Sequence, residues 1–246
     1  MAPPMISENP CFITFLKERL AQNPPPQKGA RTRERLKIAA AEVLEEKGYL
    51  ATKAGDIAAR AGVAEGSFYI YFKDKTDSTI NVLTTLLDEF VLLPSQSPDT
   101  AEHPFKAIRR ANRRWISVAR ANPGLMRCVL QLGDENPDFA AVVQRANRTW
   151  FGHVARSVAQ RRGIIDQAPM LFAVYLLGAM MDELLRKLII YPDRDFIALL
   201  QTLHGDDEMV ADATSIVWLR VLHPGESLPR NLSRAVKAFA NVLLPG

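Results

Sequence analysis

The chain has 246 residues, 48% of them hydrophobic, so it can bury a sizeable core in one large or two modest domains. Its 31 lysines and arginines against 27 acidic residues give a net charge of +4, which permits nucleic-acid binding without requiring it. Two cysteines, Cys11 and Cys128, exclude a disulfide framework and indicate a reducing cytoplasm. The first residues lack the layout of a secretion signal, and the apolar run 170–181 is too short to span a bilayer, so no membrane partner is expected.

Residues 1–30 are expected to form a flexible N-terminal extension, because the prolines at 3–4 and 24–26 disfavour helix. The alternative is a short docked helix over residues 11–20, where apolar side chains recur at helical spacing. A basic cluster follows and is interpreted either as a solvated helix start or as an arm that contacts DNA phosphates. It comprises Lys28, Arg31, Arg33, Arg35 and Lys37.

A helix is predicted over residues 31–47 and ends at Gly48. Two short helices joined by a tight turn are predicted next. Thr52 is expected to cap a helix over 53–60, and Gly62 suits the left-handed residue of the turn. The second helix, over 65–71, directs Phe68 and Phe72 inward at i, i+4 spacing. This pattern is typical of a helix-turn-helix, whose second helix enters the DNA major groove.

The residues of this stretch resemble the N-terminal domain of the tetracycline-repressor-like (TetR/AcrR) family over about residues 31–90. The similarity rests on the order and spacing of many positions, and three positions depart from the commonest pattern, namely Gly55, Ala64 and Ser78. The matching residues are Gly48-Tyr49, Thr52, Asp56-Ile57-Ala58, Ala61-Gly62-Val63, Gly66-Ser67-Phe68-Tyr69, Tyr71-Phe72 and Lys75.

The resemblance implies that Ser67 and Tyr69 meet bases or the adjoining backbone of double-stranded operator DNA, while Lys53, Tyr71 and Lys75 meet phosphates. Thr52, Gly66, Arg31 and Arg33 complete the expected DNA-binding set. On this basis, residues 31–74 are assigned to a three-helix DNA-binding domain.

Residues 75–246 are assigned to a larger helical domain for effector binding and dimerisation. It begins with a linking helix over 75–92, capped by Asp74. A helix over 105–121 carries one apolar face and one arginine-rich face over 106–120. We interpret the basic face as solvated, or as attracting an anionic effector or DNA phosphate. No strand-like alternation of useful length is present, so the fold class is all-α.

The resemblance also implies a ligand pocket among the middle helices, for a small and largely apolar effector. The candidate lining residues are Trp115, Met126, Trp150, Phe172 and Tyr175. A helix over 168–190 is apolar nearly all round in its first turns, and with a helix over 206–222 it is predicted to form a homodimer interface. The candidate interface residues are Leu176, Gly178, Ala179, Met180, Ala213, Ile216 and Val217.

The sequence offers no support for an enzyme. The four histidines are scattered, none has a metal-ligand partner at helical spacing, and no phosphate-binding glycine loop or nucleophile elbow is present, so neither metal nor cofactor is expected. The predicted function is a homodimeric, ligand-responsive transcriptional repressor. The alternative is a helical ligand-binding or adaptor protein whose helix-turn-helix no longer reads DNA.

Overall fold

The computed structural model describes residues 9–91 and 102–243, and the regular structure in these ranges is entirely helical, which confirms the all-α prediction. The chain forms two compact units. Unit 1 comprises Met1–Leu93 and Arg120–Ala146, and unit 2 comprises Pro94–Ala119 and Asn147–Gly246. The unit that holds the helix-turn-helix is therefore larger than the domain 31–74 expected from the sequence, because later segments pack into the same core.

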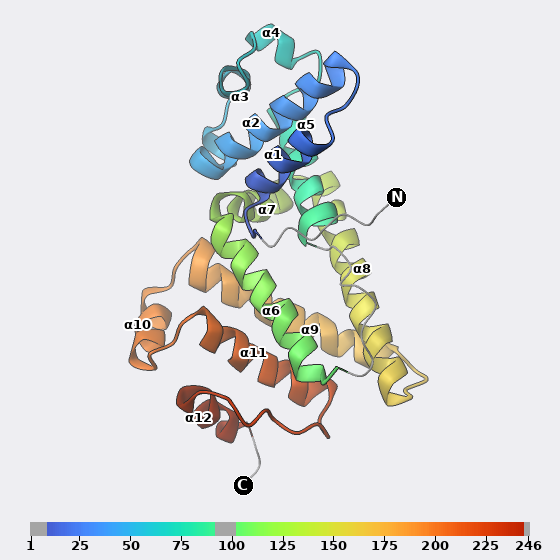
Figure 1. Ribbon diagram of the computed structural model, residues 1–246, viewed down its shortest axis with the longest axis vertical. Coiled ribbons are helices and arrows are strands. Elements are labelled where there is room, and N and C mark those ends of the chain that lie inside the picture. Colours follow the sequence, from blue (N-terminus) through green and yellow to red (C-terminus); the bar gives the residue numbers. More distant parts are fainter. Residues whose placement is uncertain (1–8, 92–101, 244–246) are drawn as a thin grey trace. The chain divides into compact units, whose positions relative to one another are not determined.

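Unit 1 is built around α2 (Lys28–Ala51), which packs against α1, α3, α5 and α7 (Figure 1). Leu36, Ala40 and Leu44 of α2 are fully buried in its core. Gly48 has a left-handed φ of 76° and ends the regular helix after Lys47, as predicted. The other elements are α1 (Phe12–Gln22), α3 (Ala54–Ala61), α4 (Glu65–Phe68), α5 (Lys75–Thr85), its π-helical continuation η1 (Leu86–Val91) and α7 (Pro123–Glu135).

The prediction of a flexible extension over residues 1–30 is wrong for α1, which is a helix docked on α2. Phe12 and Leu16 are buried in unit 1, because their side chains repeat at i, i+4 and form one apolar face. Residues 1–8 lie outside the described ranges, as do the end of the predicted linking helix at Leu92 and most of the loop before Pro104.

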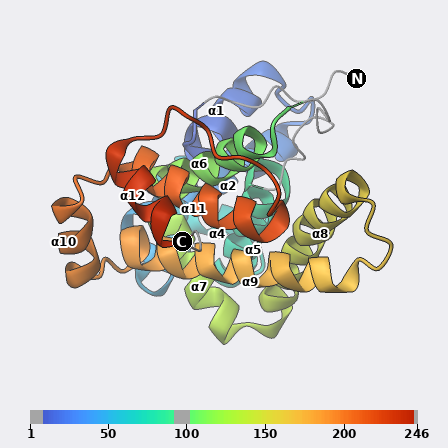
Figure 2. The same cartoon turned by 90° about the horizontal axis from the view of Figure 1, so that it is seen from below.

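Unit 2 contains two apolar clusters. One joins α8, α9 and α11 through residues such as Phe151, Val174 and Trp218. The other joins α6, α11 and α12 through Phe105, Ile216 and Val236. Viewed from below, α11 lies between α9 and α12 (Figure 2). The bounds are α6 (Pro104–Ala121), α8 (Pro137–Arg162), α9 (Ala168–Leu185), η2 (Arg186–Ile190), α10 (Arg194–Thr202), α11 (Asp207–Leu222) and α12 (Arg234–Val242), of which the first two also extend into unit 1.

The segment Ala168–Ile190, formed by α9 and η2, is 23 residues long with a mean hydropathy of 1.5, enough in length and composition to cross a membrane. Length therefore does not exclude a membrane span, contrary to the expectation from the shorter run 170–181. The core helix of a soluble protein gives the same signal, and one such helix is weak support for a membrane protein. Within unit 2, α9 packs against α11 and α8, which accounts for one side of its apolar surface.

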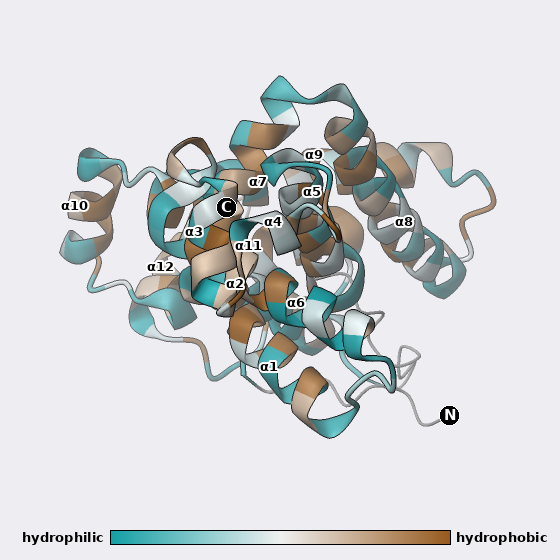
Figure 3. Ribbon diagram, turned by 90° about the horizontal axis from the view of Figure 1, so that it is seen from above, coloured by the Kyte–Doolittle hydropathy of each residue, from teal (hydrophilic) through white to brown (hydrophobic). Residues whose placement is uncertain are grey.

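α10 has no buried residue, although apolar side chains occupy one side of it. Figure 3 shows these apolar positions as brown bands on the ribbon of α10. The side chains of Phe196, Leu199, Leu200 and Leu203 repeat at helical spacing, so this short helix is amphipathic.

Candidate nucleic-acid interface

The helix-turn-helix consists of α3 and α4, and α3 is fastened to the last turns of α2 by charged side chains. Lys47 Nζ donates to Asp56 Oδ1 at 2.9 Å, and the Lys53 amide donates to Asp56 Oδ2 at 3.1 Å. These hydrogen bonds favour the carboxylate and lower the pKa of Asp56. Arg60 pairs with Glu46 at 2.6 Å, which lowers the pKa of Glu46 in the same way.

The turn between α3 and α4 uses Gly62 at φ 69° and ψ 39°, which confirms the predicted left-handed residue. The Arg35 guanidinium of α2 donates to the Ala61 carbonyl at 2.9 Å and so satisfies the end of α3. Ala64 is the N-cap residue of α4, and its side chain makes no capping hydrogen bond. α4 has four residues, shorter than the helix predicted over 65–71, because the chain continues from Phe68 in turns.

The outer side of α4 and the following turn presents a row of side chains to solvent. Phe68 and Phe72 are buried beneath it, as predicted, with ring centroids 5.6 Å apart. Gly66 is exposed, with nothing within 4 Å of where a β-carbon would stand, and Ser67 is half-buried. Tyr69 is 54% exposed and Ile70 is 75% exposed. Ile70 was not among the predicted DNA-binding residues, although its position off the Phe68–Phe72 face could have identified it.

Two predicted DNA contacts are instead used inside the protein. Thr52 is buried, and its hydroxyl donates to the Gly48 carbonyl at 2.7 Å, so it ends α2 and does not cap α3. The Lys75 ammonium donates to the carbonyls of Tyr49, Leu50 and Thr52 at 3.1–3.3 Å. An ammonium has three donors, and these bonds use all of them, so Lys75 stabilises the end of α2 and leaves none for a phosphate.

Of the remaining predicted DNA contacts, Arg31 and Arg33 lie in the first turns of α2. Arg33 stacks its guanidinium 5.1 Å from the centroid of the Phe72 ring. Arg31 Nη1 donates to the carbonyls of Pro25 and Pro26, which fixes the loop between α1 and α2. Lys53 is exposed at the start of α3. Tyr71 is half-buried, and its hydroxyl lies 3.8 Å from where a β-carbon on Gly29 would stand.

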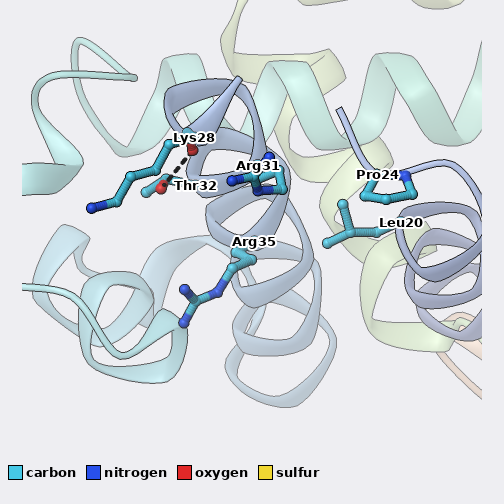
Figure 4. Close-up of a pocket in the computed structure, with 6 residues that line it drawn as sticks. All are labelled: Leu20, Pro24, Lys28, Arg31, Thr32 and Arg35. Carbon is cyan, nitrogen blue, oxygen red and sulfur yellow. Dashed lines mark hydrogen bonds between the residues drawn. The ribbon is translucent and has the colours of Figure 1, made fainter. Parts of the chain in front are cut away.

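A groove of about 340 Å³ runs between the end of α1 and the first turns of α2. In Figure 4, Leu20 and Pro24 lie on one side of it, and the cationic side chains of α2 extend away from them on the other. It is lined by Leu20, Pro24, Lys28, Arg31, Thr32 and Arg35, so all of its charged groups are basic.

The five predicted effector residues are divided between the two units. Met126 is buried in unit 1, whereas the others belong to unit 2. Phe172 is 66% exposed on the outer side of α9, so it is not a core lining residue. Trp115 and Trp150 pack against the core of α8, α9 and α11, where the Trp150 and Trp218 centroids are 5.9 Å apart. Tyr175 is partly exposed and contacts Phe151 edge to face at 4.7 Å.

The predicted dimer residues also separate into two groups. Leu176, 58% exposed, and Ala179 lie on the outer side of α9. Gly178 faces inward, because the Phe151 ring occupies the place of a β-carbon there, and Ile216 is fully buried. These two are therefore not interface residues in this unit. Met180, Ala213 and Val217 are half-buried.

The arginine-rich face of α6 is largely paired within unit 2. Arg109 pairs with Asp212 and Glu208, Arg113 pairs with Glu208 at 2.5 Å, and Arg110 pairs with Glu102 at 2.8 Å. These carboxylates raise the pKa of Arg109 and Arg110, so both remain cationic. The arginine-rich face therefore holds α6 against α11 and against the segment just before α6. It is not the unpaired surface that the interpretation as an anion-attracting face requires. Among the described residues, no group of histidine, cysteine and carboxylate side chains could hold a metal ion.

A helix-turn-helix with an exposed outer row, joined to a separate helical unit, defines a DNA-binding transcriptional regulator. Residues 38–77 match the family described as bacterial regulatory proteins, tetR family, and residues 102–205 match the MftR C-terminal domain. The chain belongs to the tetR family of bacterial regulatory proteins.

Its relatives include the fatty acid metabolism regulator protein of Bacillus subtilis (strain 168), 42% identical over 53 residues, which are 22% of this chain and 27% of that protein. The chain thus matches about a quarter of that relative's length. Over 80% of this chain, the fold resembles a Rhodococcus sp. Rha1 transcriptional regulator (TM-score 0.61, 20% identity, 99% of that chain). The fatty acid degradation regulator FadR from Bacillus halodurans is similar over the same share (TM-score 0.56, 17% identity, 97% of that chain). At these identities the structural likeness establishes the fold alone.

Proposed function

We propose that the chain is a cytoplasmic homodimeric repressor that leaves its operator when a small, largely apolar molecule binds to unit 2. The observation that carries DNA reading is the outer row of α4, which is exposed although the two phenylalanines beneath it are buried. Gly66 has no neighbour above it, so DNA can approach the backbone there.

Within this proposal, Ser67, Tyr69 and Ile70 meet base edges and the adjoining backbone. Lys53 and Tyr71 contact phosphates, and the basic first turns of α2 with Arg31 and Arg33 add to the local positive potential. Lys53 is the exposed cation of this set at the start of α3. Contacts to bases set the sequence preference, whereas contacts to phosphates set the salt dependence.

Gel-shift titration of the DNA upstream of the chain's own gene tests this proposal. Tyr69→Ala should change the preferred sequence and weaken binding by about tenfold, since one good base contact contributes 1–3 kcal/mol. Tyr191→Ala is the matched control, because Tyr191 is an exposed tyrosine of unit 2 and should leave binding unchanged. If the wild type shifts no DNA, the alternative of a helical adaptor that no longer reads DNA replaces this proposal.

Dimerisation is assigned to the outer faces of α9 and α11. Phe172 and Leu176 are exposed large side chains at i, i+4 on α9, and Ala179 continues the same face. On α11, Val217 is half-buried and Val221 is exposed. An apolar face of this kind favours a second copy, and a two-fold axis would place two reading heads at half-sites about 34–36 Å apart.

Sedimentation of a charged variant tests the dimer. Leu176→Asp should give monomers with reduced operator affinity, because a carboxylate on an apolar interface is left unpaired. Ile165→Asp is the control, since Ile165 is 98% exposed outside α9 and should not change the assembly. A wild type that sediments as a monomer at micromolar concentration contradicts the proposal.

The effector is assigned to the aromatic group of unit 2. Tyr175, Phe151, Trp150 and Trp218 follow one another in that order, with neighbouring ring centroids 4.7–5.9 Å apart. The Trp218 indole nitrogen is buried and has no hydrogen-bond acceptor among the described residues. A ligand with an apolar body and one acceptor oxygen would satisfy this donor, which supports an effector of that class.

Two relatives are named for fatty acid regulation, so fatty acids of increasing chain length are the first ligands to test. The readouts are tryptophan fluorescence and release of the bound DNA. Trp150→Leu should abolish ligand-induced release and leave operator affinity nearly unchanged. If no member of the series alters either signal, this ligand class is wrong, whereas DNA binding is judged by the gel shift alone.

A further inference from the structure

α1 precedes residues 38–77, the part of the chain that matches the tetR-family description, so it is an addition to that region. Its contacts within unit 1 reach three different elements. Figure 1 shows α1 lying along α2, with its first turn beside α7. Phe12, Phe15 and Phe90 form an aromatic group with centroids 5.2–6.1 Å apart, which joins α1 to η1.

Asn122 binds the backbone at the start of α1. Its side-chain oxygen accepts from the Phe12 amide at 2.9 Å, and its side-chain nitrogen donates to the Pro10 carbonyl at 2.8 Å. Asn122 is fully buried and occupies the N-cap position of α7, where an asparagine would ordinarily cap its own helix. Here the Asn122 side chain does not cap α7 and instead binds the backbone at the start of α1.

Glu45 of α2 takes over the cap of α7. Its two carboxylate oxygens accept from the amides of Gly124 and Leu125, each at 2.9 Å. Gly124 is required at this point, because a β-carbon would collide with the backbone of Glu45. α7 is thus held to α2 by the Glu45 carboxylate, while the Asn122 side chain binds the backbone at the start of α1.

Ion pairs complete these connections. Arg19 pairs with Glu34 of α2 at 3.2 Å and also with Glu89 of η1. Lys17 pairs with Glu42 at 2.6 Å, and this pair reaches α2 alone. Arg19 therefore joins two elements, whereas Lys17 adds only to the docking of α1 on α2.

The chain order gives these contacts a further meaning. The chain leaves unit 1 after Leu93, shortly after η1, and first re-enters it at Arg120, just before Asn122. α1 consequently contacts η1, the last described helix before the exit, and Asn122 at the start of α7, just after the return. We propose that α1 is a coupling strap, which carries changes at these two connections to α2, the scaffold of the helix-turn-helix.

The inference rests on the proposed DNA binding and adds a route by which the two units influence one another. Coupling between sites is reciprocal, so DNA bound at α3 and α4 must alter η1 and α7 if the strap transmits. Operator DNA therefore serves as the probe, and no effector is needed. Hydrogen exchange of the full-length protein, with and without the DNA upstream of its gene, measures the effect by segment.

In the wild type, DNA should slow exchange in α3 and α4 and also in Leu86–Val91 and Pro123–Glu135. The slowing in η1 should fall about fivefold in Arg19→Gln, and the slowing in α7 should fall by a similar factor in Asn122→Ala, while that in α3 and α4 should remain in both. Lys17→Gln is the matched control and should behave as the wild type, because its ion pair does not reach η1 or α7. If Asn122→Ala unfolds, Arg19→Gln still tests the proposal. The ion pairs of Arg19 lie near the surface, so this variant should fold.

The outcomes separate the two proposals. Absence of any DNA-induced slowing in α3 and α4 overturns the proposed DNA binding. Slowing in α3 and α4 with none in η1 and α7 of the wild type overturns the strap alone. Equal behaviour of Arg19→Gln and Lys17→Gln also overturns the strap, because α1 would then act only by docking.

Discussion

In unit 1, charged side chains of one helix bind the ends of another, whereas α8, α9 and α11 of unit 2 meet mainly through aromatic and aliphatic side chains, with one charged contact from Arg162 to the Leu222 carbonyl at 2.9 Å. Glu45 caps α7, Arg35 caps α3 and Lys75 caps α2, each by hydrogen bonds to backbone atoms. In unit 2, Phe151 and Trp218 belong to a wholly apolar cluster. Backbone groups are fixed in position and side chains can shift, so unit 1 should tolerate small changes less well than unit 2.

The sharpest test of this difference is a methyl group at two glycines. Gly124→Ala places a β-carbon against the backbone of Glu45, which cannot rotate away, so unit 1 should lose about 3 kcal/mol of unfolding free energy. Urea denaturation followed by circular dichroism measures the loss. Gly133→Ala is the control in the same helix, because nothing lies near that position, and it should stabilise by about 0.5–1 kcal/mol.

Gly178→Ala makes the corresponding change in unit 2, where the obstacle is the Phe151 ring. A ring can shift, so the expected cost is lower, about 2 kcal/mol. All three tryptophans, at 115, 150 and 218, lie in unit 2, so their fluorescence follows the unfolding of this unit. Phe151→Leu in the same chain should recover part of the loss, and a cost equal to that of Gly124→Ala would remove the proposed distinction.

Lys75 tests the use of charge in unit 1. Lys75→Met removes a cation that donates to three carbonyls, so protection of α2 amides against hydrogen exchange should fall by about 1.5 kcal/mol. The dependence of DNA binding on salt should stay as in the wild type. Lys53→Ala should do the reverse, with little change in stability and a salt slope lowered by about 0.9. If Lys75→Met instead lowered the salt slope of DNA binding, Lys75 would contact a phosphate after all.

The two regions also differ in how far the sequence predicts them. The helix-turn-helix follows from local signals, namely the left-handed Gly62 and the i, i+4 pair Phe68 and Phe72, and both were predicted correctly. The roles of Thr52 and Lys75 were not predicted, because both donate to backbone carbonyls left without helical partners where α2 breaks at Gly48. In the sequence, a cation that stabilises a helix end cannot be distinguished from one that binds phosphate.

In unit 2, the sequence predicts helices but not which side of each faces the core. α9 is apolar nearly all round, so periodicity cannot separate Leu176, which faces outward, from Gly178, which lies under Phe151. Met126 and Trp115 were grouped as effector residues because both are large and apolar, although they belong to different units. The docking of α1 depends on Asn122 and Phe90, which are far away in sequence, so local patterns could not establish it.

The smallest effect is expected at the polar end of α9, where two adjacent carboxylates have shifts of opposite sign. Asp182 is exposed, but the apolar bulk around it disfavours its charged form and raises its pKa to about 6. A raised pKa in the folded state means that its contribution to stability is present below about pH 4 and is lost as the pH rises through 6. Asp182→Asn should therefore gain stability over the wild type between pH 4 and 6 and keep that gain at pH 7.

Glu183 gives the internal comparison. Its hydrogen bond to Arg186 lowers its pKa, so its contribution is present at neutral pH and is lost as the pH falls through the lowered value. Glu183→Gln should therefore be slightly less stable than the wild type at pH 7 and match it in acid. Tryptophan fluorescence during urea denaturation at pH 4 and pH 7 measures both variants in unit 2. Solvent reaches both carboxylates, so each effect should be small, and the opposite signs are the decisive result. If Asp182→Asn and Glu183→Gln respond to pH in the same direction, desolvation by α9 does not govern Asp182.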